Sequence, residues 1–307
     1  MKKRDYRIDL LRVIACIMVI GIHAPQKGLA YSGVFLVGSS YLCEPCIGLF
    51  FMISGYLLLP VKLSYKDFIS KRLNRVLIPT VCFSVFYIIL RSVAQFDQEA
   101  GWGGIIKSFV VPFISIPFHF QGSTVLWFMY PLIGIYLIAP IISPFLEKIS
   151  EKEYRIILLL WLVSLTLKTV SNFIEVSLSE QSILYYFYGY IGYFILGYYL
   201  RRFPQKISIW FFPLLILIPC AVCYLDHSYD LHVETWYLSI FGAMQSFAWF
   251  QFVIQYVDSN KWPNCVKKWV ADFSDCSFGI YLIHSFVLFH CLSKIDLNDY
   301  PQRGDEL

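Results

Sequence analysis

Long apolar stretches follow one another along almost the whole chain, with short polar segments between them. A helix needs about 20 apolar residues to cross the hydrocarbon of a bilayer. The expected fold is therefore all-α: a polytopic integral membrane helix bundle that forms one transmembrane domain over residues 1–307. Stretches of suitable length predict about nine transmembrane helices, near residues 8–24, 36–59, 76–95, 123–143, 154–173, 183–200, 208–225, 236–257 and 277–293.

Lysine and arginine are unevenly divided between the polar segments. Most of the 25 basic residues fall in alternate segments that share one side of the membrane, among them Lys2 to Arg7, Lys62 to Arg75, and Arg201 with Arg202. Cytoplasmic segments of membrane proteins are enriched in such residues. The pattern predicts a cytoplasmic N-terminus and, because the number of spans is odd, a C-terminus on the outer side.

The connection 96–122 contains a further apolar stretch, from Phe109 to Phe120. This stretch is too short to cross a bilayer, and Pro112 and Pro117 interrupt it. We expect an interfacial or re-entrant segment on the outer side.

Composition supports a membrane protein and argues against a soluble domain. The chain is 58% hydrophobic and 15% charged, whereas soluble domains are roughly 25% charged. The first apolar run carries Arg12 and His23 and lacks a small-residue cleavage site, so we expect it to remain in the mature protein. We expect membrane lipid around the bundle and no nucleic-acid partner.

The nine cysteines do not predict a metal site. Cys43 and Cys46, like Cys220 and Cys223, have the spacing of a redox or zinc pair, but both pairs lie at or inside apolar spans. Cysteine packs there as a small hydrophobic residue. Without a second pair and nearby histidines, the zinc interpretation is weak.

Ionisable residues within the spans are the strongest candidates for function, because each is costly in hydrocarbon. Arg12 and His23 are eleven residues apart in the first span. They therefore project from one helix face, with a rise of roughly 16 Å between them. The alternative is that Arg12 pairs with Asp9 while His23 caps the end of the helix.

Glu44 is the second candidate, because it precedes Pro45 in the outer half of the second span. If Pro45 begins the inner helical segment, the helix dipole favours a carboxylate at this position. Glu44 could approach His23 and orient its imidazole. The alternative is a helix cap in a polar crevice.

Further candidates follow later in the chain. Arg72 and Arg75 are spaced by three residues on the cytoplasmic side and could grip phosphates, although such residues also serve topology alone. His284, three residues after Tyr281 in the last span, would be a second buried base or a structural hydrogen-bond donor.

Five motifs in order resemble the acyltransferase-3 family of bacterial membrane O-acyltransferases, which modify surface glycans. The resemblance covers most of the chain. The motifs are Arg7-Ile8-Asp9-Leu10-Leu11-Arg12 with His23, Leu49-Phe50-Phe51-Met52-Ile53-Ser54-Gly55-Tyr56, Arg72-Leu73-Asn74-Arg75 before Pro79, Leu126-Trp127-Phe128 leading to Tyr136 and Pro140, and Ser277-Phe278-Gly279-Ile280-Tyr281-Leu282-Ile283-His284.

The resemblance implies transfer of an acyl group, expected to be acetyl, from acyl-coenzyme A to a hydroxyl of a cell-envelope polysaccharide or its lipid-linked precursor. The location would be the bacterial cytoplasmic membrane. Acetyl-coenzyme A would be a co-substrate, and no tightly bound cofactor is expected.

The same resemblance suggests roles for individual residues. His23 would be the general base and Arg12 would stabilise negative charge; Glu44, a candidate from its position alone, would orient His23. Arg72 and Arg75 would bind the phosphates of the donor. The remaining candidates for the site are His284, Trp127 and Ser54. We expect direct transfer, with Ser54 or Cys16 as alternative nucleophiles.

Two other classes of protein remain open. A transporter could use Arg12, Glu44, His23 and His284 as an anion or proton pathway; the lack of an internal repeat argues mildly against it. The family usually has one more span after the helix that bears His284, so an inactive membrane partner in glycan assembly is the second alternative.

Overall fold

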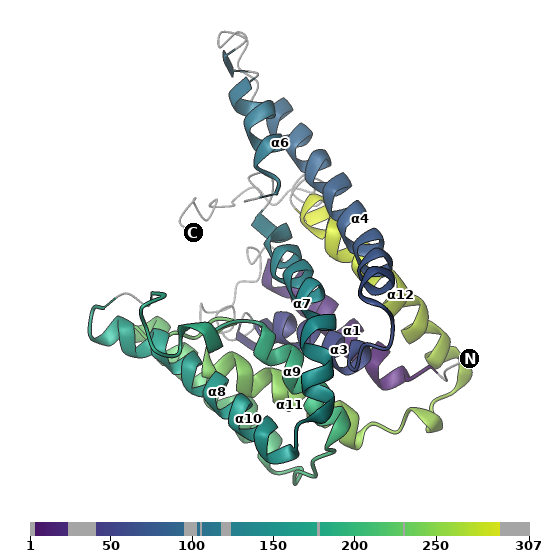
Figure 1. Ribbon diagram of the computed structural model, residues 1–307, viewed down its shortest axis with the longest axis vertical. Helices are drawn as coiled ribbons and strands as arrows, with labels where there is room; N and C mark the ends of the chain where they lie inside the picture. Colours follow the sequence, from purple (N-terminus) through teal and green to yellow (C-terminus); the bar gives the residue numbers. More distant parts are fainter. Residues whose placement is uncertain are drawn as a thin grey trace, which may run out of the picture. The chain divides into compact units, whose positions relative to one another are not determined.

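The computed structural model describes residues 4–23, 41–94, 103–104, 106–117, 124–176, 179–229 and 231–288 (Figure 1). Every regular element in these ranges is a helix, which confirms the all-α prediction. By length and composition, four helices in the described ranges could cross a membrane. They are Tyr41–Leu58, Tyr65–Val93, Val125–Lys148 and Glu151–Phe173.

A helix lies in each of the nine predicted stretches. The corresponding helices are α1 (Tyr6–His23), α3 (Cys46–Leu58), α4 (Tyr65–Ala94), α7 (Met129–Lys148), α8 (Glu151–Phe173), α9 (Ile191–Arg202), α10 (Phe211–Tyr229), α11 (Ile240–Tyr256) and α12 (Asn264–Phe286). The prediction placed the starts of α4 and α12 too late and the start of α9 too early.

The chain divides into two compact units, Met1–Leu58 with Ile149–Leu307, and Leu59–Lys148. In the first unit α3 packs against α9, α1 and α11, while α12 packs along α1 and α10 along α11. The core of this unit is apolar and rich in aromatic rings. Its most deeply buried side chains include Leu11, Leu49, Phe51, Met52, Tyr154, Tyr193, Phe194 and Phe250.

Two glycines allow the backbones of α3 and α9 to touch. A side chain at Gly55 would collide with the carbonyl of Phe194, and one at Gly197 would collide with the carbonyl of Met52. Small residues have this function at helix contacts in membranes, where close approach supplies the packing energy. The contact therefore explains the glycine that follows Ser54 in the second motif.

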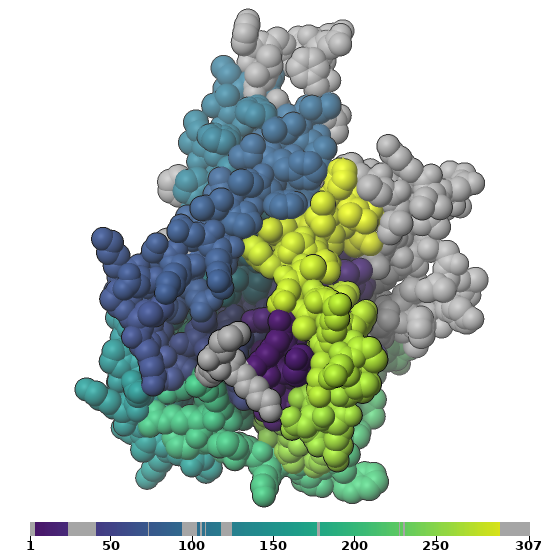
Figure 2. Space-filling view, turned by 90° about the vertical axis from the view of Figure 1, so that its right-hand side faces the viewer, coloured from purple at the N-terminus to yellow at the C-terminus, as the bar shows by residue number. Residues whose placement is uncertain are grey.

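Helices α1 and α12 run parallel and touch at three points along their length. The hydroxyl of Ser274 donates to Asp9 (2.8 Å), the thiol of Cys16 faces the carbonyl of Ser277 (3.8 Å), and the rings of His23 and His284 lie 5.2 Å apart. The three contact positions on α1 are seven residues apart, which keeps one helix face toward α12. Figure 2 shows the purple residues of α1 directly beside the yellow-green surface of α12.

Among the described residues of the second unit are α4, α7 and the short helices η2 (Ile106–Val110), α6 (Val111–Ser115) and η3 (Thr124–Phe128). Helix α4 packs against α7, η2 and α6. The hydroxyl of Tyr130 on α7 donates to the carbonyl of Ile116 (2.7 Å), which fixes the end of the short-helix pair. The described part of this stretch forms two short helices, neither long enough to cross a bilayer; residues 118–120 lie outside the described residues, and an interfacial or re-entrant placement stays a prediction.

Candidate active site

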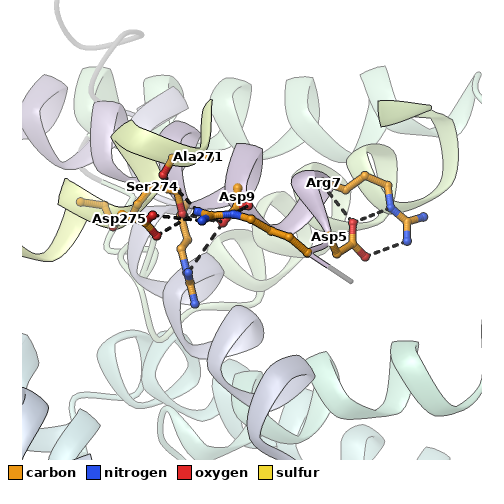
Figure 3. Close-up of polar contacts among 9 residues, drawn as sticks. Asp5, Arg7, Asp9, Ala271, Ser274 and Asp275 are labelled. Atoms are coloured by element: carbon orange, nitrogen blue, oxygen red, sulfur yellow. Dashed lines mark hydrogen bonds and ion pairs between the residues drawn. The ribbon is translucent and has the colours of Figure 1, made fainter. Parts of the chain in front are cut away.

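Asp9 organises the first turns of α1 (Figure 3). Its carboxylate is 4% exposed and accepts hydrogen bonds from Arg4 Nε (2.6 Å) and Ser274 Oγ (2.8 Å). Arg4 also donates to Asp275 (2.9 Å) and to the carbonyl of Ala271 (3.0 Å). The hydrogen bond from Arg4 lowers the pKa of Asp275 below its ordinary value. These contacts join the segment before α1 to α12.

Arg12 forms an ion pair with Asp9, at 3.8 Å between Nη1 and Oδ1. This is the contact expected from the alternative in which Arg12 pairs with Asp9. The distance is too long for a hydrogen bond, and Arg4 makes the shorter contacts to the same carboxylate. The ion pair holds Arg12 near the beginning of α1, far along the helix axis from His23.

A separate ion pair stabilises the segment before α1. Arg7 donates to Asp5 through two guanidinium nitrogens (2.8 and 3.0 Å) and to the carbonyl of Ile254 on α11 (2.9 Å). Burial raises the pKa of the Asp5 carboxyl, but Arg7 outweighs this effect, so the pKa lies below its ordinary value. The Arg7 of the first motif therefore has a structural explanation.

His23 is the last residue of α1, and its ring lies beside that of His284. The ring centres are 5.2 Å apart and the planes are tilted by 43°. His284 is 4% exposed, with Nδ1 2.5 Å from the carbonyl oxygen of Tyr281. Sequence reasoning singled out both histidines separately, and the structure brings them together.

Glu44 lies in the turn that precedes α3 and is 3% exposed. In the described part of the chain, no hydrogen bond or ion pair joins it to His23. Its carboxyl instead interacts electrostatically with Glu234, between α10 and α11. The carbonyl of the adjacent Pro45 accepts hydrogen bonds from Leu49 N (2.9 Å) and Ser246 Oγ (3.3 Å). The orientation of His23 by Glu44 stays a prediction.

Sequence reasoning missed Glu234. Its backbone N–H donates to the hydroxyl of Thr169 on α8 (3.1 Å). Burial raises the pKa of the Glu234 carboxyl above its ordinary value, while the charge of Lys168 acts in the opposite direction. An acidic residue in a short connection is ordinary, so no pattern in the sequence points to it; its hydrogen bond to α8 and its electrostatic interaction with Glu44 depend on the tertiary structure.

Arg72 and Arg75 lie one turn apart on α4, in the second unit. The Arg72 guanidinium stands over the ring of Phe68, 5.8 Å from its centre, and Arg75 is exposed. The 30 residues of α4 extend about 45 Å, more than the roughly 30 Å of bilayer hydrocarbon. The beginning of α4, with both arginines, can therefore project beyond the membrane.

The remaining candidates belong to different units. Ser54 is half-buried in α3, and Trp127 is half-buried in η3, with its ring edge-on to that of Phe128 at 6.4 Å. Next to Ser54, the carbonyl of Tyr56 accepts a hydrogen bond from Arg201 of α9 (2.6 Å). Arg201 thereby caps the C-terminal end of α3. Within the described ranges, no cluster of three or more potential metal ligands occurs.

These contacts and helices define an all-α integral membrane protein with a pair of imidazoles at the end of its first helix. The chain belongs to the acyltransferase-3 family: the sequence model of this family, described as an acyltransferase domain, matches residues 5–301. The resemblance inferred from the motifs is confirmed. No curated protein and no solved structure matches the chain.

Proposed function

We propose that the protein transfers an acetyl group from acetyl-coenzyme A to a hydroxyl of a cell-envelope polysaccharide or its lipid-linked precursor, in the bacterial cytoplasmic membrane. Family membership supports acyl transfer in general. The observation that carries the proposal further is the packing of His23 against the buried His284. A neutral imidazole is a suitable base for a hydroxyl at neutral pH.

The reaction requires one proton to change places. The acceptor oxygen attacks the thioester carbonyl, the C–O bond forms and the C–S bond breaks. His23 takes the proton from the hydroxyl and returns it to the coenzyme A thiolate as it leaves. No oxidant or metal is needed for this balance, and no acyl-enzyme has to form.

Arg12 is better suited to binding the donor than to stabilising the oxyanion. The rise along α1 separates it from His23 by roughly 16 Å, and its ion pair with Asp9 holds it near the first turns. An oxyanion donor must lie about 3 Å from the reacting carbonyl. We therefore assign Arg12 to the binding of the donor along its long pantetheine arm.

Arg72 and Arg75 would bind the phosphates of coenzyme A. Their spacing of one helical turn puts two guanidinium groups on one face of α4. Guanidinium groups recognise phosphate through paired hydrogen bonds. The exposure of Arg75 leaves it accessible to a donor that arrives from the cytoplasm.

Mass spectrometry of envelope glycans tests the proposal whichever sugar is the acceptor. Glycans from cells with the chain should contain a species heavier by one acetyl group than those from cells without it. Mild alkaline treatment should remove the difference, because it cleaves esters. Identical glycan masses in both strains would contradict the proposed function and favour a transporter or an inactive partner.

A further inference from the structure

The parallel packing of α1 and α12 gives His284 a specific place beside His23. Contacts at Asp9 with Ser274 and at Cys16 with Ser277 set the register, and the next contact along the helices is the histidine pair. The two rings therefore lie side by side because α1 and α12 pack along their length in this register.

The hydrogen bond of His284 defines its tautomer. Nδ1 lies 2.5 Å from the carbonyl oxygen of Tyr281, and a carbonyl can only accept. Nδ1 therefore carries the proton, and Nε2 of the neutral ring has a lone pair. Nε2 is buried and has no hydrogen-bond partner among the residues that the structure describes. A buried acceptor of this kind requires an explanation.

The distance between the rings fits a hydrogen bond between the two imidazoles. An imidazole nitrogen lies roughly 1.2 Å from its ring centre, so a bond of about 2.9 Å between two nitrogens spans roughly 5 Å in total. The ring centres of His23 and His284 are 5.2 Å apart. No hydrogen bond joins the two rings in the structure, so this bond requires one nitrogen of His23 to turn toward Nε2.

We propose that His284 is a positioning residue for His23: its Nε2 accepts the N–H of His23 and directs the other, unprotonated nitrogen of His23 to the acceptor hydroxyl. This inference rests on the proposed function. When His23 takes the proton of the hydroxyl, the resulting imidazolium keeps its hydrogen bond to His284. The proton then passes from His23 to the thiolate, and His284 gains and loses none.

A neutral imidazole suits this place better than a carboxylate. In hydrocarbon surroundings an unpaired charge is costly, whereas the lone pair of a neutral ring accepts a hydrogen bond without adding charge.

Two substitutions at His284 separate positioning from packing. His284→Phe keeps a planar ring but removes the acceptor, while His284→Gln keeps an acceptor oxygen and a donor. Membrane vesicles from cells that express each variant would receive radiolabelled acetyl-coenzyme A, with the glycans of the vesicles as acceptors. We expect His284→Phe to lower kcat about 10- to 100-fold, the usual effect of losing an orienting partner, at an unchanged KM for acetyl-coenzyme A.

His284→Gln should retain kcat within a few-fold of wild type. Equal kcat in wild type and His284→Phe would overturn the inference, as would equal losses in both variants. Thermal unfolding in detergent checks that the two variants fold alike.

A second measurement does not depend on acyl transfer. Nitrogen chemical shifts of 15N-histidine distinguish a protonated ring nitrogen from one with a lone pair, and His23→Ala identifies the signals of His23. We expect one tautomer of His23 in the wild type and a mixture in His284→Phe. The same tautomer population in both proteins would overturn the inference. Wild-type vesicles without acetyl incorporation would instead contradict the proposed function, and the nitrogen shifts would still decide the role of His284.

Discussion

Asp9 joins three polar groups at the beginning of α1, and its charge is central to that arrangement. Arg4 and Ser274 donate hydrogen bonds to it, and Arg12 forms an ion pair with it. This set of contacts links α1 to α12, on which the register of the two histidines depends. The contacts of Asp9 lie at the other end of α1 from the two histidines. They can affect the candidate site only by setting how α1 packs against α12.

Asp9→Asn should destabilise the protein by about 1.5–3 kcal/mol, because hydrogen bonds to a charged group are lost while Arg4 and Arg12 remain. Thermal unfolding in detergent measures the effect. Asp272→Asn is the matched control, since Asp272 is an exposed residue of α12. Equal midpoints for the two variants would mean that Asp9 has no special role.

Arg72→Ala and Arg75→Ala should each weaken binding of coenzyme A by about 1–3 kcal/mol, the scale of a hydrogen bond to a charged group. Isothermal titration calorimetry with coenzyme A measures this directly. Arg91→Ala removes the same group near the other end of α4 and should leave the affinity unchanged. If all three variants bind equally weakly, general charge rather than a phosphate site explains the loss.

At the residue scale, local spacing predicted the candidates but not their partners. The helical period correctly indicated that Asp9 could pair with Arg12, three residues away. It could not indicate that His23 meets His284, because that contact depends on how two distant helices pack. For the same reason the interaction of Glu44 with Glu234 was missed.

At the scale of helices, apolar windows located the elements but not their ends. They detect only residues suited to hydrocarbon. The missed first part of α4 is polar and begins after Ser64, whose hydroxyl accepts from Asp67 N (3.1 Å). The predicted span 183–200 began too early because the backbone at Gly189, with φ 142°, is not helical, and α9 begins only after it. Its Tyr-rich beginning is apolar without being a continuous helix.

Gly55→Ala should destabilise the contact of α3 with α9 by about 1–3 kcal/mol, the usual cost of overpacking. The added methyl group meets the backbone carbonyl of Phe194, which cannot move without displacing α9. Gly279→Ala is the control, because nothing lies within 4 Å of a Cβ at that position. Thermal unfolding should separate the two variants; a Gly55→Ala protein as stable as the control would contradict the close backbone contact.

At the scale of the whole molecule, the parallel course of α1 and α12 constrains the topology. Their N-terminal ends must face the same side of the membrane. With the N-terminus in the cytoplasm, a reporter fusion after residue 260 should therefore read cytoplasmic, whereas fusions after residues 65 and 230 should read cytoplasmic and extracytoplasmic respectively. The distribution of lysine and arginine predicts the same sides. An extracytoplasmic signal at residue 260 would contradict both arguments.

The central claim is that this chain transfers acetyl groups with His23 as the base. Vesicles that contain wild type, His23→Ala or His232→Asn would receive radiolabelled acetyl-coenzyme A, and label in the glycan fraction would be counted. His232 has a φ of 56°, which asparagine tolerates. His232→Asn is therefore a control that also removes one histidine, but outside the candidate site. We expect incorporation by wild type and His232→Asn, and a loss of at least about 100-fold in His23→Ala with unchanged coenzyme A affinity. Wild-type incorporation by His23→Ala would contradict the account.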